Sequence, residues 1–159
     1  MDYRKEYEKW LASPALSEDE RRELKALEGN DKEIKARFYG PLEFGTAGLR
    51  GTMYTGLHNM NRHVIRWATQ GFANVIRAEG GEAMKKGVAV CMDCRNHSAE
   101  FARETACVMA ANGIHVRLFE SLRPTPELSF AVREYGCQAG VNVTASHNPK
   151  EYNGYKVYW

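Results

Sequence analysis

Apolar positions in the segment 61–80 recur every three or four residues, which is the spacing of one face of an α-helix. Five residues define this face: Ile65, Ala68, Phe72, Val75 and Ile76. Asn61 stands before the first turn, where an asparagine side chain can accept a hydrogen bond from a free backbone amide. The pattern therefore predicts a long amphipathic helix over 61–80.

Beyond this helix, short apolar runs alternate with amphipathic segments. The runs predict strands and the segments predict helices. In chain order the predicted elements are a strand at 87–93, a helix at 98–113, a strand at 114–120, a helix at 126–136, a strand at 139–146, a tight Asn-Gly turn at 153–154 and the start of another strand at 154–159. Such alternation indicates α/β layers. We expect a layered α/β/α domain with a mostly parallel mixed sheet.

The N-terminal region has a different pattern, in which charged residues recur at helical spacing. Helices are predicted at 2–12, at 17–29 and, shorter, at 31–40. Ser17 and Glu20 have the spacing of a capping box, in which each side chain bonds the other residue's backbone amide. We predict an N-terminal helical extension over residues 1–40 and one α/β domain over 41–159, with a glycine-rich loop at 43–53 between them.

Composition and charge exclude several classes of protein. The chain has 159 residues, enough to bury a core, and a formal net charge of +2 from 22 basic and 20 acidic side chains. This balance gives no electrostatic argument for binding nucleic acid or a membrane surface. No apolar run is long enough to span a bilayer, and the charged N-terminus lacks a signal-peptide core. We expect a cytoplasmic protein that binds neither nucleic acid nor membrane.

The chain has four cysteines, and two of them form a C-x-x-C pair. They are Cys91, Cys94, Cys107 and Cys137. A zinc or redox site is one interpretation of the pair, but a tetrahedral zinc site needs further ligands and no second C-x-x-C exists. The surrounding pattern predicts a strand, where positions three apart point to opposite faces. We expect buried, reduced cysteines.

A β-branched run ends at Ser146 and continues into His-Asn-Pro, which favours an abrupt turn. Ligands of α/β sheets bind beyond the carboxyl ends of the strands, so a hydroxyl at this place can face a cleft. Three loops should gather there: the loop after Asp93, the Arg-Pro-Thr-Pro loop at 123–126, and the loop of Ser146. The residues alone leave a second interpretation open, a turn with only local hydrogen bonds.

Residues 144–158, T-A-S-H-N-P-K-E-Y-N-G-Y-K-V-Y, resemble the phosphoserine loop of the α-D-phosphohexomutase family, which comprises phosphoglucomutases and phosphomannomutases. Three other stretches resemble elements of the same family in the same order. F-G-T-A-G-L-R-G at 44–51 resembles its arginine loop, V-A-V-C-M-D-C-R-N-H-S at 88–98 its strand ending in Asp-x-Arg, and P-T-P at 124–126 a further element. The helical extension and two of these stretches are most similar to the phosphoglucomutase/phosphopentomutase branch.

The resemblance implies a phosphoserine mechanism. Phosphorylated Ser146 would donate its phosphoryl group to a hydroxyl of a sugar phosphate, and the resulting bisphosphate would return its other phosphoryl group to Ser146. The net reaction interconverts hexose 1- and 6-phosphates, or pentose 1- and 5-phosphates. Glucose 1,6-bisphosphate would act as the activator that first loads the serine.

Other site residues follow from the same resemblance. Arg50 would contact phosphoryl oxygens, Lys156 would be a proton-transfer group, and His147 would hydrogen-bond the phosphate or the sugar. From the residues alone, the alternatives are a surface arginine, an exposed strand lysine and a loop-packing histidine. Asp93 and Arg95 are expected to pair or to hold loops, outside the catalytic set.

The family holds Mg²⁺ with the phosphoserine and three aspartates of a D-G-D-x-D motif, which this chain lacks. Ser146, through its phosphate, would be the one metal ligand here. The resemblance thus implies the first domain of a phosphomutase, truncated at its C-terminal end and inactive or nearly so alone. Its partners would be a sugar phosphate and the remaining domains of the parent enzyme. The alternative is a non-enzymatic binding module that retained the loop.

Overall fold

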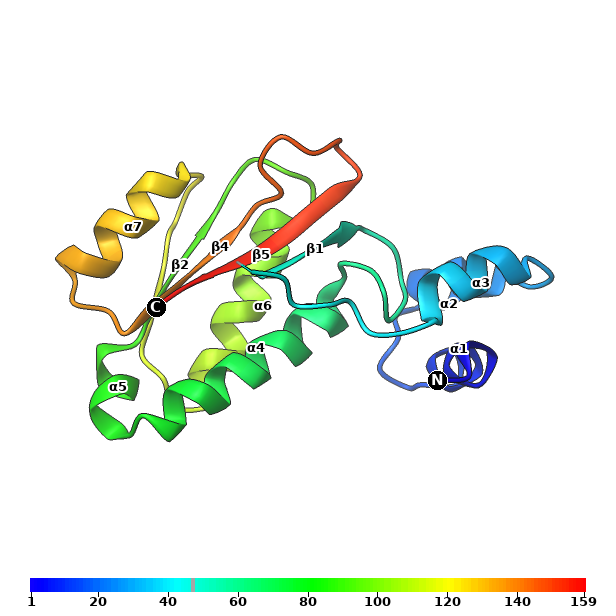
Figure 1. The fold of residues 1–159 in the computed structure, drawn as a ribbon, viewed down its shortest axis with the longest axis horizontal. Helices are drawn as coiled ribbons and strands as arrows, with labels where there is room; N and C mark the ends of the chain where they lie inside the picture. The colour runs from blue at the N-terminus through cyan, green and yellow to red at the C-terminus, as the bar shows by residue number, and fades with distance from the viewer. Residues whose placement is uncertain (47) are drawn as a thin grey trace.

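A computed structural model describes residues 1–46 and 48–159, and a five-stranded sheet with the order β1-β5-β4-β2-β3 forms its centre (Figure 1). The strands are β1 Gly48–Thr52, β2 Val88–Met92, β3 Val116–Leu118, β4 Ala139–Val143 and β5 Tyr152–Tyr158. β5 pairs antiparallel with β1 and β4, whereas β2 pairs parallel with β3 and β4. β5 is therefore the one reversed strand, and the prediction of a mostly parallel mixed sheet is confirmed.

Helices cover both faces of the sheet, as predicted for α/β/α layers. The helices of the domain are α4 Arg62–Ala78, α5 Gly81–Lys86, α6 Ser98–Ala111 and α7 Thr125–Glu134. Alternate residues of β2 separate the layers: Val88 and Val90 join the core beneath α4 and α6, while Ala89 and Cys91 pack against Leu128 of α7. Figure 1 shows α7 on the side of the sheet away from α4 and α6. None of the helices described is long and apolar enough to cross a bilayer.

The N-terminal helices form a separate group at one end of the molecule (Figure 1). They are α1 Tyr3–Leu11, α2 Glu18–Lys25 and α3 Asp31–Phe38. Their own small core is centred on the buried side chains of Leu24 and Phe38. The predicted capping box is present, since Ser17 and Glu20 each bond the other residue's backbone amide. The expected helical character of this region is therefore confirmed.

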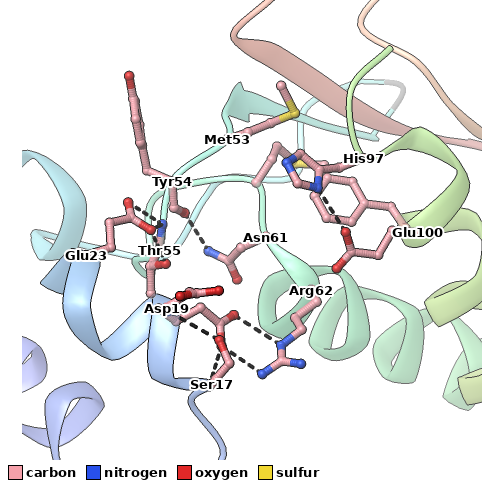
Figure 2. Close-up of a pocket in the computed structure, with 13 residues that line it drawn as sticks. Ser17, Asp19, Glu23, Met53, Tyr54, Thr55, Asn61, Arg62, His97 and Glu100 are labelled. Atoms are coloured by element: carbon pink, nitrogen blue, oxygen red, sulfur yellow. Dashed lines mark hydrogen bonds and ion pairs between the residues drawn. The ribbon is translucent and has the colours of Figure 1, made fainter. Parts of the chain in front are cut away.

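A polar junction attaches this helical group to the domain. Figure 2 shows a pocket of about 320 Å³ there, in which Ser17 of the extension faces Arg62 at the start of α4. Glu20 accepts a hydrogen bond from Arg62 Nη2 at 2.7 Å, and its Oε1 lies 3.1 Å from His63 Nε2. Glu23 on the same helix contacts the backbone and hydroxyl of Thr55. Carboxylates of α2 thus link the extension to the sheet domain.

Glu20 makes this junction sensitive to pH. Partial burial opposes ionisation, but hydrogen bonds from Ser17 and Arg62 and the charge of His63 outweigh it and lower the pKa of Glu20. A lowered folded-state pKa stabilises the fold above the unfolded pKa of about 4.3, and this contribution is lost as pH falls through the folded value. We expect Glu20→Gln to reduce the free energy of unfolding by about 1 kcal/mol at neutral pH.

Urea unfolding of both proteins at neutral pH and at about pH 3, below the unfolded pKa, measures this effect. The difference between Glu20→Gln and the unaltered chain should shrink at the lower pH. Glu8→Gln is the matched control, because Glu8 is an exposed side chain of α1. An equal difference at both pH values would show that the charge of Glu20 has no part in it.

The sequence predicted a glycine-rich loop over 43–53, but part of this segment is a strand. Residues Gly48–Thr52 form β1 and pair with β5. A Cβ at Gly48 would lie 1.8 Å from the carbonyl oxygen of Tyr155, so glycine is what allows the two strands to approach. Ala47, within the same segment, lies outside the described residues. The glycines that indicated a loop instead permit an edge strand.

The predicted Asn153-Gly154 turn is also wrong, because both residues lie inside β5. Asn153 is fully buried and its amide donates to the carbonyl of Asn96 and to the hydroxyl of Ser98. A Cβ at Gly154 would lie 2.6 Å from the carbonyl oxygen of Thr144. The pair therefore serves close packing between strands.

All four cysteines are free thiols, but the expectation that they are buried holds for one of them. Cys91 is buried on β2, and burial raises the pKa of its thiol to about 11. Cys94 and Cys107 are exposed and Cys137 is half-buried. Cys94 is exposed because β2 ends at Met92 and Cys94 already belongs to the following loop.

The long helix α4 buries most of the predicted face, with Val75 as the exception. Ile65 and Ile76 are fully buried, as expected, but Val75 is 50% exposed and Phe72 is half-buried. The buried face also includes Thr69, whose hydroxyl donates to the phenol of Tyr155 on β5. Part of the apolar surface of this helix stays exposed, at Trp67 and Val75.

Candidate functional site

Ser146 stands three residues beyond the end of β4, on a strained turn. Thr144 and Ala145 are buried, and the Thr144 hydroxyl oxygen accepts a 3.0 Å hydrogen bond from the Ser146 amide. Ser146 has a φ of +58°, in the left-handed region that non-glycine residues rarely adopt. Such strain is stored where surrounding contacts hold it, often at functional sites. These contacts hold the backbone of Ser146, which presents an exposed hydroxyl beyond the carboxyl end of a central strand.

Arg95 holds the loop that follows Ser146. Its Nη2 donates to the carbonyl oxygens of Ser146 and Asn148 at 2.7 and 2.6 Å, and its Nη1 donates to those of Pro149 and Tyr152 at 2.9 and 3.0 Å. Its side chain is 11% exposed. One guanidinium, with its fixed fork of donors, thus satisfies four backbone carbonyls and ties the loop to the end of β2.

Asp93 in turn holds Arg95. Its Oδ1 accepts hydrogen bonds from the Arg95 amide at 2.9 Å and from the Ser98 hydroxyl at 2.8 Å, and its Oδ2 lies 3.6 Å from Arg95 Nε. The expectation that Asp93 and Arg95 pair and hold loops is confirmed. The amide of Arg123 donates to the carbonyl of Met92, so the 123–126 loop also joins this edge, as topology predicted.

Arg50 and Lys156 lie on one face of neighbouring strands, beside Ser146. Gly48 of β1 pairs with Lys156 of β5, and Arg50 stands two residues further along β1. All three side chains, of Ser146, Arg50 and Lys156, line one open pocket of about 430 Å³. Ser146 therefore faces a cleft, as its place beyond a strand predicted, and Arg50 and Lys156 line the same cleft.

A direct contact joins Arg50 to the loop of Ser146. Arg50 Nη1 donates to Asn148 Oδ1 at 3.1 Å. His147 is exposed, and its Nδ1 lies 3.5 Å from Ser146 Oγ at the edge of hydrogen-bonding distance. The structure thus brings the four predicted residues together, with His147 touching the serine from outside the pocket lining. Their catalytic roles stay predictions.

The charges of the pocket suit an anionic ligand. Arg50 and Lys156 are positive, and Glu43 is the one acidic side chain among the described residues that line it. No group of three or more His, Cys, Asp or Glu side chains suited to a metal occurs within residues 1–46 and 48–159. The residues around Ser146 therefore fit a phosphate better than they fit a Mg²⁺ ion, which needs several oxygen ligands.

The sequence did not identify the number of contacts that Arg95 makes, nor the Arg50–Asn148 contact. The signal for Arg95 was the Asp-x-Arg at the end of a predicted strand. The acceptors of Arg95 are backbone carbonyls, which any residue carries, so no pattern of side chains marks them.

Comparison with known proteins gives one consistent result. A family model described as phosphoglucomutase/phosphomannomutase, alpha/beta/alpha domain I, matches residues 41–159. The human phosphopentomutase is 42% identical over 138 residues, which cover 83% of this chain and 22% of that protein. The phosphoglucomutase of Staphylococcus aureus strain COL is 41% identical over 129 residues, covering 81% of this chain and 23% of that protein.

A solved structure shows the same similarity in three dimensions. The structure of a phosphomannomutase from Thermus thermophilus superimposes with a TM-score of 0.68 and 33% identity, covering 75% of this chain and 26% of that one. The chain thus spans about a quarter of the length of the relatives that it matches.

Proposed function

The chain belongs to the phosphoglucomutase/phosphomannomutase family, and from this we propose that it is the phosphoserine domain of a sugar phosphomutase. The observation that carries the proposal is the presentation of Ser146: a strained serine at the end of a central strand, in one pocket with Arg50 and Lys156. The clamp of Arg95 on the loop carbonyls supports it, because phosphoryl transfer depends on positioning more than on an unusual nucleophile.

In the proposed reaction, phosphorylated Ser146 transfers its phosphoryl group to a hydroxyl of a sugar monophosphate. The bond from Ser146 Oγ to phosphorus breaks and a bond from the sugar oxygen to phosphorus forms. The proton of that hydroxyl ends on the serine oxygen that leaves. It passes there directly or through Lys156, whose ammonium gives one proton to the leaving oxygen and takes the hydroxyl proton in its place. The bisphosphate then returns its other phosphoryl group to Ser146, so that the sugar phosphate is isomerised and the enzyme is restored.

Arg50 stabilises the charge of the transferred group. A guanidinium offers several donors in a fixed plane and remains charged, which suits the equatorial oxygens of a phosphoryl group. Its contact with Asn148 holds it close to the serine loop before the substrate arrives. His147, at the exposed side of Ser146, is placed to bond the phosphate or the sugar.

The proposed substrates are hexose or pentose phosphates, since similar proteins include phosphoglucomutases and phosphopentomutases. Glucose 1,6-bisphosphate is the proposed activator that loads Ser146, and the proposed location is the cytoplasm. The described residues do not fit a Mg²⁺ site, so we derive no metal step from this chain and assign it only the phosphoserine oxygen as a ligand. Other ligands and the sugar-binding parts would come from further domains.

A chimera tests this function. Residues 41–159 replace the matching segment of the Staphylococcus aureus phosphoglucomutase, and conversion of glucose 1-phosphate is followed after addition of glucose 1,6-bisphosphate. We expect turnover, together with a phosphoryl group on the peptide that contains Ser146 in mass spectrometry. A folded chimera with neither turnover nor phosphoserine would favour the alternative, a binding module that retains the loop.

A further inference from the structure

Asn142 is a polar residue in the middle of the central strand β4. It is 1% exposed, and its Nδ2 donates to the hydroxyl oxygen of Thr125 at 2.7 Å. Its Oδ1 accepts no hydrogen bond from the described residues. A buried amide oxygen without a donor is costly, so its presence calls for an explanation in the neighbouring strands.

The register of the sheet identifies the neighbours of Asn142. Cys91 of β2 and Lys156 of β5 stand directly opposite it. Side chains opposite one another in paired strands share a face, with Cβ atoms about 5 Å apart. The thiol of Cys91 donates to the carbonyl of Arg123 at 3.4 Å, which leaves it directed elsewhere.

Lys156 is the remaining neighbour with donors to offer. Its ammonium makes no hydrogen bond or ion pair within residues 1–46 and 48–159, and its stem is long enough to lie across β4. On the same face, Tyr158 packs with the cluster beneath α7, and Arg50 and Glu43 are the other charged groups of the pocket. The acceptor without a donor and the ammonium without an acceptor therefore belong to residues that stand opposite one another in paired strands.

We propose that Asn142 is a positioning residue for Lys156, with Oδ1 accepting a hydrogen bond from the ammonium. Thr125 completes the arrangement, because its contact with Nδ2 fixes the orientation of the amide and leaves Oδ1 free to accept another hydrogen bond. The meaning of this contact rests on the proposed function, in which Lys156 moves the proton of the reacting hydroxyl. It also gives the Pro-Thr-Pro motif at 124–126 a role: it places Thr125 at the start of α7 against β4.

NMR of the lysine ammonium groups in the 159-residue chain tests this contact without any phosphoryl chemistry. Ammonium protons exchange slowly with water when they are held in a hydrogen bond. We expect one protected signal that disappears in Lys156→Arg and is thereby assigned to Lys156. In Asn142→Leu, which has a similar shape and no acceptor, its exchange should be at least about tenfold faster, as expected for a hydrogen bond to a charged group.

Two further variants keep the test decisive. Asn142→Asp retains an acceptor and should preserve the protected signal, which a purely structural role would not predict. Thr125→Val leaves Asn142 in place but removes the hydrogen bond that orients its amide. Exchange of the Lys156 ammonium protons should then be faster, by a smaller factor than in Asn142→Leu. This variant also provides the test if Asn142→Leu does not fold. Glu43 and Arg50 are unchanged throughout, and Asn142→Asp is the one variant of the set that adds a charge beside Lys156.

Absence of a protected Lys156 signal in the unaltered chain would overturn the proposal. Equal exchange in the folded Asn142→Leu, or in Thr125→Val if the first does not fold, would overturn it too. These outcomes are distinct from failure of the proposed function, because a protected Lys156 ammonium in a chimera without turnover would leave the contact intact and remove only its catalytic meaning.

Discussion

In the chimera described above, replacing Ser146 by alanine is expected to reduce phosphomutase turnover by several orders of magnitude. Alanine has no oxygen to carry the phosphoryl group, so no covalent intermediate can form. Stability should change by about 1 kcal/mol or less, since the side chain is exposed and its one polar contact among residues 1–46 and 48–159 is the 3.5 Å approach to His147. Arg50→Ala and Lys156→Ala should lower turnover less completely, because each assists the transfer without carrying the group.

The measurement is conversion of glucose 1-phosphate by the chimera after addition of glucose 1,6-bisphosphate, with circular dichroism to verify folding. Ser121→Ala is the matched control, because Ser121 is an exposed serine of another loop and lies outside the pocket lining. Near-normal turnover by a folded Ser146→Ala chimera would exclude the phosphoserine mechanism and leave a binding module as the better account.

Replacing Arg95 by methionine is expected to release the loop of Ser146. The carbonyls of Ser146, Asn148, Pro149 and Tyr152 would lose their shared donor. Asp93 would lose its ion pair with the guanidinium and keep its hydrogen bonds from the amide of residue 95 and from Ser98. We expect the free energy of unfolding to fall by roughly 2–4 kcal/mol, as for the loss of several partly buried hydrogen bonds to a charged group. Turnover of the chimera should fall by about a hundredfold or more, because misplaced catalytic groups forfeit the advantage of orientation.

Arg95→Lys should restore little of this loss, since one ammonium cannot present the planar fork that reaches four acceptors. Urea unfolding, together with hydrogen exchange of the amides of residues 146–152, measures both the stability and the order of the loop. Arg103→Met, at an exposed position of α6, controls for the loss of a positive charge. Full stability and turnover in Arg95→Lys would show that charge alone, and not the four contacts, is what the loop requires.

Periodic segments of this chain could be predicted from sequence, whereas pairing between distant segments could not. The helices and central strands follow from residues that repeat at 3.6 or 2 positions, a property of each segment by itself. β1 has no such signal, because its glycines indicate a loop and its strand character exists only through pairing with β5. The Asn153-Gly154 pair was wrongly predicted to be a turn for the same reason. Its extended conformation depends on pairing with β1, a strand that is distant in the sequence.

The candidate site shows the same division. Ser146, Arg50 and Lys156 could be predicted as site residues because their motifs are local, and the structure places all three in one pocket. Strand polarity predicted the position of the serine beyond the carboxyl end of β4. The left-handed backbone of Ser146 and the four carbonyl contacts of Arg95 were not foreseen, since a backbone conformation imposed by distant contacts leaves no mark in composition. For α4, periodicity identified an apolar helix but could not determine how much of its surface the sheet would cover, as exposed Trp67 and Val75 show.

The single reversed strand has a consequence for the order in which the molecule is assembled. β5 is the last strand in this sequence, yet it separates β1 from β4, so β1 has no hydrogen-bonding neighbour until β5 has been synthesised. Closing that long loop is a slow, non-local step, whereas α4, α6 and the parallel strands can associate earlier. During synthesis on the ribosome, the strand that carries Arg50 would therefore have no partner strand while most of the domain forms. Arg50 would come close to Lys156 only when β5 inserts between β1 and β4.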